Sequence, residues 1–192
     1  MNGVQITIRD AVPEDAGRLL EIYRHYVENT AVSFEYVSPS PAEFRARMVS
    51  TQRRYPYLVL LRDGCIEGYA YAGPFKARAA YDRSVETTIY LAPDAQKQGL
   101  GRMLCEALEE ALRKMGVLNL YACVAFPERE DEYLTTNSAD FHAHLGYTVA
   151  GHYHKCGWKF GRWYDMIWME KMLGEHGENP APVVDYPSAK RR

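Results

Sequence analysis

The sequence predicts an α+β (mixed α/β) fold, in which a central, mixed and twisted β-sheet is flanked by helices. Three observations support this prediction. Two segments with helix-start signals open the chain, a tight hairpin signal follows at Asp63-Gly64, and strand-like and helical segments then alternate up to residue 171. This order is typical of helices packed on a mixed sheet. A length of 192 residues fits a single domain.

A short strand and two helices come first. Ile6 and Ile8 alternate with polar residues, which indicates a strand. The segment 13–15, Pro-Glu-Asp, starts a helix because proline is tolerated in the first turn and acids favour the positive end of the helix dipole. Ser-Pro-Ala-Glu at 40–43 is a capping box, and it predicts a second helix that fades by Arg53.

The central part of the sequence predicts a hairpin and then a strand that leads into a helix. Strands at 57–61 and 66–72 are joined by Asp63-Gly64, since a type I′ turn needs positive φ at both central positions. A strand at 85–91 is followed by an amphipathic helix at 100–115 with a leucine-rich face.

The last elements predicted are a strand at 117–124, a short helix at 137–145, and strands at 147–154 and 164–171. Asn137 is a candidate cap of the short helix. The residues between the late strands, 155–162, are expected to form a loop that closes over a pocket.

The chain ends in a segment of different composition. Residues 175–192 carry three prolines and little apolar pattern. We expect residues 1–174 to form the single domain and 175–192 to be a mostly disordered tail.

Charge and hydropathy exclude several classes of protein. Lys plus Arg is 23 and Asp plus Glu is 25, so the net charge is −2 and no nucleic-acid partner is expected. No apolar run approaches the ~18 residues of a membrane span, so no membrane partner is expected either. The first ten residues lack the basic and apolar regions of a secretory signal, which favours a cytoplasmic protein.

The four cysteines are scattered, without a CxxC pair, as is typical of a reduced intracellular protein. His152 and His154 flank Tyr153 at strand spacing. Without a second pair of ligands they are weak evidence for zinc, and no metal is expected.

The most informative stretch joins the strand at 85–91 to the helix at 100–115. Gly99 and Gly101 let the backbone approach a ligand closely, and the free N–H groups of the helix start form an anion site. The spacing matches neither a dinucleotide-binding loop nor a nucleotide triphosphatase loop. A tight strand–helix turn without a ligand is the alternative interpretation.

This loop, Gln96-x-x-Gly99-x-Gly101, resembles the pyrophosphate loop of the GNAT superfamily of N-acetyltransferases, and so implies the GNAT fold. The similarity extends from about residue 6 to 171 and is greatest to the phosphinothricin N-acetyltransferase branch. It is carried by the segments 55–59, 68–78, 81–82, 85–91, 141–142, 145–147 and 163–165.

The resemblance implies acetyl-CoA as the acyl-donor cosubstrate. Its pyrophosphate is expected on the backbone of Gln96, Lys97, Gln98, Gly99, Leu100, Gly101 and Arg102. Its pantetheine is expected along the strand edge at Ile89, Tyr90 and Leu91, where the family splays two parallel strands. Asn137 would cap a helix, contact CoA, or do both.

Two residues are candidates for proton transfer. Glu86 lies within a strand, where a carboxylate is costly unless it is partnered or functional; the resemblance implies that it takes the proton of the amine. His142 would protonate the departing thiolate or assist as a base. The alternatives are a salt-bridged structural glutamate and a half-exposed helix histidine.

The resemblance implies an acceptor site at Phe34, Tyr71, Lys76, Arg78 and Tyr81, where the basic pair would hold a small carboxylate. We therefore expect N-acetylation of a small amino-acid-like molecule of the phosphinothricin or methionine-sulfoximine type. Alternatives are an acetyltransferase for protein N-termini or polyamines, and a non-catalytic CoA-binding module. The family further implies a homodimer. Glu35 stands where the family usually has a basic residue.

Overall fold

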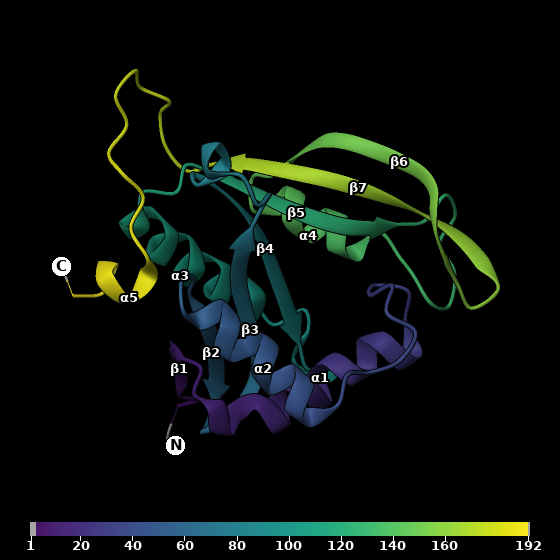
Figure 1. Cartoon of the computed structure of the whole chain (residues 1–192). Coiled ribbons are helices and arrows are strands. Elements are labelled where there is room, and N and C mark those ends of the chain that lie inside the picture. The colour runs from purple at the N-terminus through teal and green to yellow at the C-terminus, as the bar shows by residue number, and fades with distance from the viewer. Residues whose placement is uncertain (1–2, 192) are drawn as a thin grey trace.

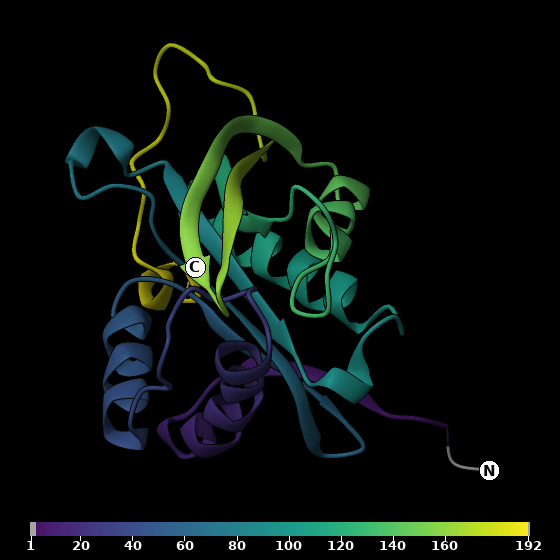
Figure 2. The same cartoon turned by 90° about the vertical axis from the view of Figure 1, so that its right-hand side faces the viewer.

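A computed structural model describes residues 3–191, which form one seven-stranded sheet in the order β1-β2-β3-β4-β5-β7-β6. Figure 1 shows the element order, and Figure 2 shows α1 and α2 on one face of the sheet with α3 and α4 on the other. The strands are β1 (Ile6–Asp10), β2 (Tyr57–Arg62), β3 (Cys65–Pro74), β4 (Ser84–Leu91), β5 (Asn119–Phe126), β6 (Thr148–Lys159) and β7 (Arg162–Met172). The helices are α1 (Ala16–Asn29), α2 (Pro41–Gln52), α3 (Leu100–Met115), α4 (Asn137–His144) and α5 (Tyr186–Ala189). The α+β prediction and its mixed sheet are confirmed.

The core lies on both faces of the sheet. Leu104 and Leu112 of α3 are fully buried on one face, and Leu19 and Met48 of α1 and α2 are buried on the other. Each helix therefore covers the sheet with its apolar stripe. Within residues 3–191 we find no helix with the length and apolar composition needed to span a bilayer.

The parallel pairing of β4 with β5 is short. It covers only three pairs, from Ser84 opposite Asn119 to Glu86 opposite Tyr121. Beyond this point β4 continues along β3 and β5 continues along β7, so the two strands diverge, as Figure 1 shows. The edge of β4 that faces β5 thus has no strand partner over residues 87–91 within the described part of the chain.

The expected loop at 155–162 is wrong, because β6 and β7 continue through it as one long hairpin. Its turn is Phe160-Gly161, with φ of 51° and 75°. Both angles are positive, as a type I′ hairpin turn requires. The glycines at 157 and 161 suggested a loop, but cross-strand pairing on β7 keeps residue 157 in the strand.

This hairpin is fastened to the end of α1 by a buried lysine. Lys159 is 2% exposed, and its Nζ donates hydrogen bonds to the carbonyl oxygens of Val27, Thr30 and Ser33 at 2.7, 2.8 and 2.6 Å. The carbonyls of Val27 and Thr30 lie at the C-terminal end of α1, where the negative end of the helix dipole favours a cation. The ammonium group thus holds the turn after α1 against the hairpin.

A glycine makes a second contact between the same segments. A Cβ atom built on Gly157 would overlap the ring of Phe34. The ring therefore lies directly on the backbone of β6, and only glycine leaves room for it.

The tail is more ordered than its composition predicts. Tyr186 donates a hydrogen bond to Asp10 at 2.9 Å, and the Val184 amide donates to the carbonyl of Met115 at 2.9 Å. Ala189 of α5 is buried in the main core cluster. Contacts with distant segments therefore join this part of 175–192 to the domain, although its local pattern is weak.

Candidate active site

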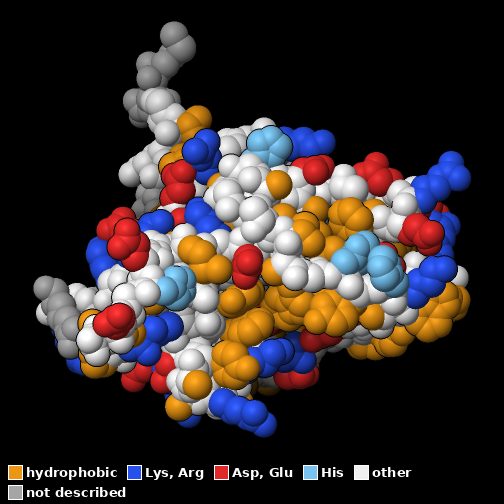
Figure 3. All heavy atoms as spheres, turned by 90° about the horizontal axis from the view of Figure 1, so that it is seen from above, with side chains coloured by type: hydrophobic (Ala, Val, Ile, Leu, Met, Phe, Trp, Pro, Cys, Tyr) orange, Lys and Arg blue, Asp and Glu red, His pale blue; other side chains and the backbone are white. Residues whose placement is uncertain are grey.

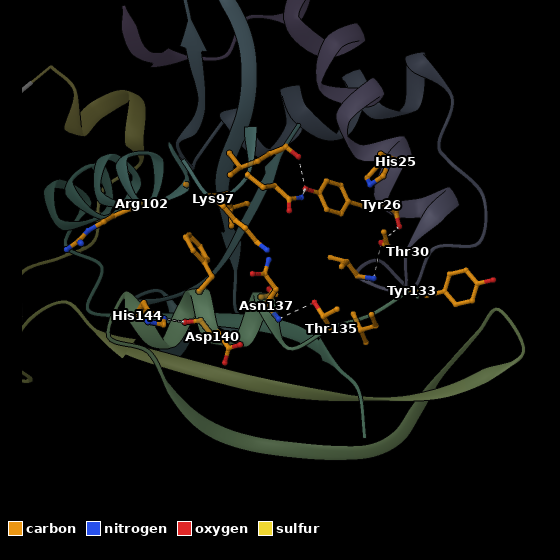
Figure 4. A pocket seen from close by; sticks show the side chains of 18 of the residues that line it. His25, Tyr26, Thr30, Lys97, Arg102, Tyr133, Thr135, Asn137, Asp140 and His144 are labelled. Atoms are coloured by element: carbon orange, nitrogen blue, oxygen red, sulfur yellow. Dashed lines mark hydrogen bonds between the residues drawn. The ribbon is translucent and has the colours of Figure 1, made fainter. Parts of the chain in front are cut away.

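A cavity of about 770 Å³ opens between the end of α1, the loop after β4 and α4 (Figure 4). Its walls come from segments that are far apart in the sequence. The lining residues are His25, Tyr26, Thr30, Val32, Ile89, Leu91, Gln96, Lys97, Gly99, Gly101, Arg102, Glu132, Tyr133, Leu134, Thr135, Asn137, Ser138, Asp140, Phe141 and His144. The diverging edge of β4 contributes Ile89 and Leu91, so the cavity extends to the gap between the two parallel strands.

The loop at the start of α3 has the geometry of an anion site. Lys97 and Gly99 both have positive φ, 58° and 78°. Gly99 is the N-cap of α3, and no side chain caps the helix start. The first N–H groups of a helix lack partners within it, and alternating left-handed residues turn such groups toward one concavity. These donors, with Lys97 and Arg102 in the cavity wall, suit a phosphate group.

A tyrosine holds this loop against α1. The Tyr26 hydroxyl donates a hydrogen bond to the Leu91 carbonyl at 2.6 Å and accepts one from Gln96 Nε2 at 3.0 Å. On the opposite side of the loop, Gly101 packs closely against Phe141 of α4, because a Cβ at 101 would lie only 3.2 Å from the Phe141 ring. The loop is therefore positioned by α1 on one side and by α4 on the other.

Most residues expected to bind the cosubstrate line this cavity. They are Ile89, Leu91, Gln96, Lys97, Gly99, Gly101, Arg102 and Asn137. Three others are absent from its lining. Tyr90 turns to the opposite face of β4 and packs on Tyr26 at 4.9 Å between ring centres, Gln98 donates to the Asp94 carbonyl, and Leu100 is buried in the core.

Sequence reasoning missed the walls formed by α1 and by residues 132–135. A tyrosine in the apolar stripe of the first helix was a usable signal for Tyr26, because a buried hydroxyl needs a hydrogen-bond partner.

The acidic loop at 128–132, which leads into this wall, has a structural role. Asp131 accepts hydrogen bonds from the amides of Tyr133 and Leu134, and Glu132 pairs with Arg162 at 2.8 Å.

Asn137 does not cap the short helix. The N-cap position belongs to Thr136, and Asn137 is the first residue of α4. Its side chain lies in the cavity wall near Lys97 (Figure 4). The sequence left two roles open for Asn137, helix capping and contact with CoA. The structure is compatible with the second role only.

Glu86 lies where β4 and β5 part. Its carboxylate is half-buried on the face of β4 opposite to Ile89, and no hydrogen bond to it is found within residues 3–191. Burial raises the pKa of this carboxyl above its usual range, and the positive charge of Lys76 opposes the rise. An unpartnered carboxylate with a raised pKa is a suitable proton acceptor.

His142 lies on the other face, so the structure does not bring it beside Glu86. It is 6% exposed and lines a small internal cavity with Thr87 and Tyr147. Its Nδ1 is 2.7 Å from the Ser138 carbonyl, which can only accept a hydrogen bond, so Nδ1 carries a proton. Burial lowers the pKa of the ring. The imidazole is therefore neutral, with a lone pair on Nε2.

None of the five expected acceptor residues lines the large cavity. Tyr71 and Lys76 lie on the Glu86 face of the sheet: burial and, to a smaller extent, the charge of Glu86 raise the pKa of Tyr71, and Lys76 lies over the Phe75 ring at 4.9 Å. Tyr81 packs edge-on against Phe75 at 6.0 Å. Arg78 and Phe34 are exposed. Tyr71 and Lys76 therefore lie across β4 from the cavity.

Glu35 is paired rather than free. Its carboxylate accepts a hydrogen bond from Arg47 at 2.6 Å, and Arg47 also binds Glu43 at 2.6 Å. The guanidinium neutralises the acid that stands where a basic residue was expected.

An anion nest, a cavity of about 770 Å³ and an open strand edge together suit an extended ligand with an anionic end. Residues 8–168 match the acetyltransferase (GNAT) domain. This chain belongs to the GNAT family of acetyltransferases.

Relatives in sequence and structure agree with this assignment. The chain is 35% identical over 173 residues to a phosphinothricin N-acetyltransferase of Streptomyces coelicolor, covering 88% of this chain and 97% of that protein. It is 34% identical to an L-amino acid N-acyltransferase of Escherichia coli, with 92% and 99% covered. A phosphinothricin acetyltransferase from Sinorhizobium meliloti, solved with AcCoA, superimposes with a TM-score of 0.83 at 34% identity, covering 94% of this chain and 98% of that one.

The loop geometry predicts the effect of one substitution. In Gly99→Asp, a carboxylate enters the anion nest and repels pyrophosphate, so calorimetry should detect no CoA binding while the melting temperature stays near that of the wild type. Gly64→Asp is the matched control. Gly64 has φ of 83° and equally open surroundings, but it lies in the β2–β3 turn. Equal CoA affinity in the two variants would contradict the assignment of the loop.

Proposed function

We propose that this protein is an acetyl-CoA-dependent N-acetyltransferase that acetylates the amine of a small amino-acid-like acceptor by direct acyl transfer. The observation that carries the proposal is the gap between β4 and β5. The anion site at the start of α3 lies in the cavity beside this gap, and the Glu86 carboxylate lies where the two strands part. The relatives named for phosphinothricin and L-amino acid acylation support the class of acceptor.

The cavity fits acetyl-CoA on three observations. The loop at 96–102 would hold the pyrophosphate through its backbone amides. The free edge of β4 at 89–91 would pair with the amides of pantetheine, as an added peptide strand pairs with a sheet edge. Asn137 and Phe141 would line the same path. When bound, the thioester supplies the activated acetyl group.

The protein's own contribution is chiefly positioning. An α-amino group has a pKa near 8, so its deprotonation at pH 7 costs only about 1.4 kcal/mol. Orientation of the reactants contributes ~7–11 kcal/mol. Glu86 receives the proton of the amine, directly or through water, and adds about 10²–10⁴-fold. No covalent nucleophile is required.

His142 serves as a neutral group beside the gap. With Nδ1–H donated to Ser138, Nε2 is an acceptor, so the ring cannot donate a proton to the thiolate without first taking one up. Its lowered pKa opposes that uptake. Of the two roles expected from the sequence, only assistance as a base can start from this tautomer, and the lowered pKa makes Nε2 a weak base.

The acceptor would bind on the Glu86 face of the sheet. Lys76 and Arg78 would receive its carboxylate, with Tyr71, Tyr81 and Phe34 around them. The Lys76 charge acts on Glu86, so a bound carboxylate and the catalytic carboxylate would share one neighbouring cation. An amine flanked by a carboxylate, as in an amino acid, suits this arrangement.

We also propose a cytoplasmic homodimer that needs neither nucleic acid nor membrane. Exposed aromatic side chains support the dimer. Trp158 and Trp163 pack together at 5.1 Å on the β6–β7 hairpin, and Trp163 is 57% exposed. Figure 3 shows hydrophobic side chains gathered on the side of the molecule that carries this hairpin. All four cysteines are free, as in a reducing compartment.

A panel of amines tests the substrate class. Free amino acids should release CoA thiol from acetyl-CoA faster than their carboxamides, peptides with free N-termini or polyamines. Lys76→Met should raise KM for the amino acid by roughly tenfold or more, because a charged hydrogen bond is lost, with a smaller change in kcat. Faster turnover of peptides or polyamines would instead favour one of the alternative acceptors.

Replacement of Glu86 tests the proton acceptor. Glu86→Gln should lower kcat/KM by about 10²–10⁴-fold at pH 6, where the amine is protonated and needs a base. The deficit should shrink as pH approaches the pKa of the amine near 8, because free amine then forms without help. The wild type should lose activity as falling pH protonates Glu86, and its raised pKa places that loss at a higher pH than for an ordinary glutamate. CoA affinity should be unchanged. A pH-independent deficit would assign Glu86 a structural role.

Sedimentation tests the assembly. At micromolar concentration we expect a species of twice the 22.0 kDa chain mass. Trp163→Glu should shift it toward the monomer, because a charge would be buried in an apolar interface. A wild-type protein that sediments only as a monomer would overturn the dimer.

A further inference from the structure

Three side chains on the α3–α4 face of the sheet converge away from the proposed active site. His152 Nε2 lies 2.7 Å and His154 Nδ1 lies 3.2 Å from one oxygen, Oδ2 of Asp165. The ligand atoms of all three residues lie within 4.8 Å of one another. The histidines come from β6 and the aspartate from β7, so the cluster bridges the two strands.

A strand irregularity creates this arrangement. Between the pairs Tyr153–Met166 and Gly157–Tyr164, β6 has three residues opposite the single residue Asp165. This bulge folds around the carboxylate: Lys155 adopts a φ of 47°, and its amide donates to Asp165 Oδ1 at 2.7 Å. Bulges commonly redirect side chains next to functional sites, and a lysine with positive φ is held there only by its surroundings.

The carboxylate is prepared as a ligand. Its side chain is only 6% exposed, with one oxygen fixed by the Lys155 amide and the other turned to both imidazoles. A hydrogen-bonded second oxygen is the usual support of a metal-binding carboxylate. The ring centres of the two imidazoles lie 4.1 Å apart, so one cation beside them could use a nitrogen lone pair from each.

We propose that His152, His154 and Asp165 bind one Zn²⁺ ion, which links β6 to β7 and completes its coordination with water. Imidazole nitrogen with one carboxylate suits zinc and its transition-metal neighbours, whereas Ca²⁺ and Mg²⁺ prefer all-oxygen sites. Three protein ligands and an open position are a common zinc arrangement.

The distances from the two imidazoles to the carboxylate need only a small adjustment. Ligand atoms about 2.0–2.1 Å from a tetrahedral ion lie about 3.3 Å apart. The two imidazole nitrogens lie 2.7 and 3.2 Å from Asp165 Oδ2, so the cluster would open by roughly half an ångström. The His154 side chain is 73% exposed and free to make this movement. Solvent reaches the site along the same side.

Calorimetry with zinc chloride on the untagged, full-length protein tests the site. We expect one ion per chain and a rise in melting temperature with zinc but not with calcium or magnesium. His154→Ala and Asp165→Asn should each weaken zinc binding by at least about tenfold. Both variants are expected to fold, because His154 is exposed and asparagine still accepts the Lys155 amide.

Two controls separate this site from other zinc ligands. His176→Gln removes an exposed histidine that pairs with Asn119, and Cys156→Ser removes the thiol of the bulge. Both should leave the affinity unchanged, and cobalt bound to the wild type should lack a thiolate charge-transfer band. Absence of saturable zinc binding, or equal affinity in His154→Ala and the wild type, would overturn the proposal. In either case the two histidines would only hydrogen-bond to Asp165.

Discussion

The site depends on the point at which two parallel strands stop pairing. After Glu86 and Tyr121 the backbones of β4 and β5 separate, and an edge opens in the middle of the sheet. Buried backbone groups without partners are costly, so such an edge favours a ligand that carries amides of its own. Because α3 connects these strands, a short loop at 92–99 brings its first turn close to the end of β4. One departure from regular pairing therefore provides both the ligand path and its anion-binding end.

The second support of the site is the long β6–β7 hairpin. It carries the buried Lys159, which offsets its loss of hydration through three carbonyl oxygens at the end of α1. The end of α1 in turn forms a wall of the cavity and positions the phosphate loop through Tyr26. The β6–β7 hairpin thus supports the cavity indirectly, through α1, because no residue of the hairpin lines the cavity.

Local signals in the sequence were sufficient where local physics decides the structure. The helix at 100–115 was predicted with both bounds, because an amphipathic pattern lies between glycines that favour its ends. The hairpin at 155–162 was missed because cross-strand pairing outweighs glycine content. Of the candidate site, the loop at 96–102 depends on local sequence, and its glycines were a sufficient signal for the turn into α3. The Tyr26 contacts join segments that are far apart in the sequence, and the approach of Asp165 to His152 depends on the bulged register of the β6–β7 hairpin. No spacing rule reports such contacts.

The contact between Gly157 and Phe34 has an evolutionary consequence. The ring occupies the space that any side chain at 157 would need, so residue 157 cannot become larger unless residue 34 is smaller. A lineage in which residue 34 shrinks opens a void, and one in which residue 157 grows must first have passed through that void. Substitutions in this region, which includes the turn expected to contact the acceptor, therefore occur in a fixed order, first at residue 34 and then at residue 157. Related enzymes with a smaller residue at position 34 are where a larger residue at 157 should first be found.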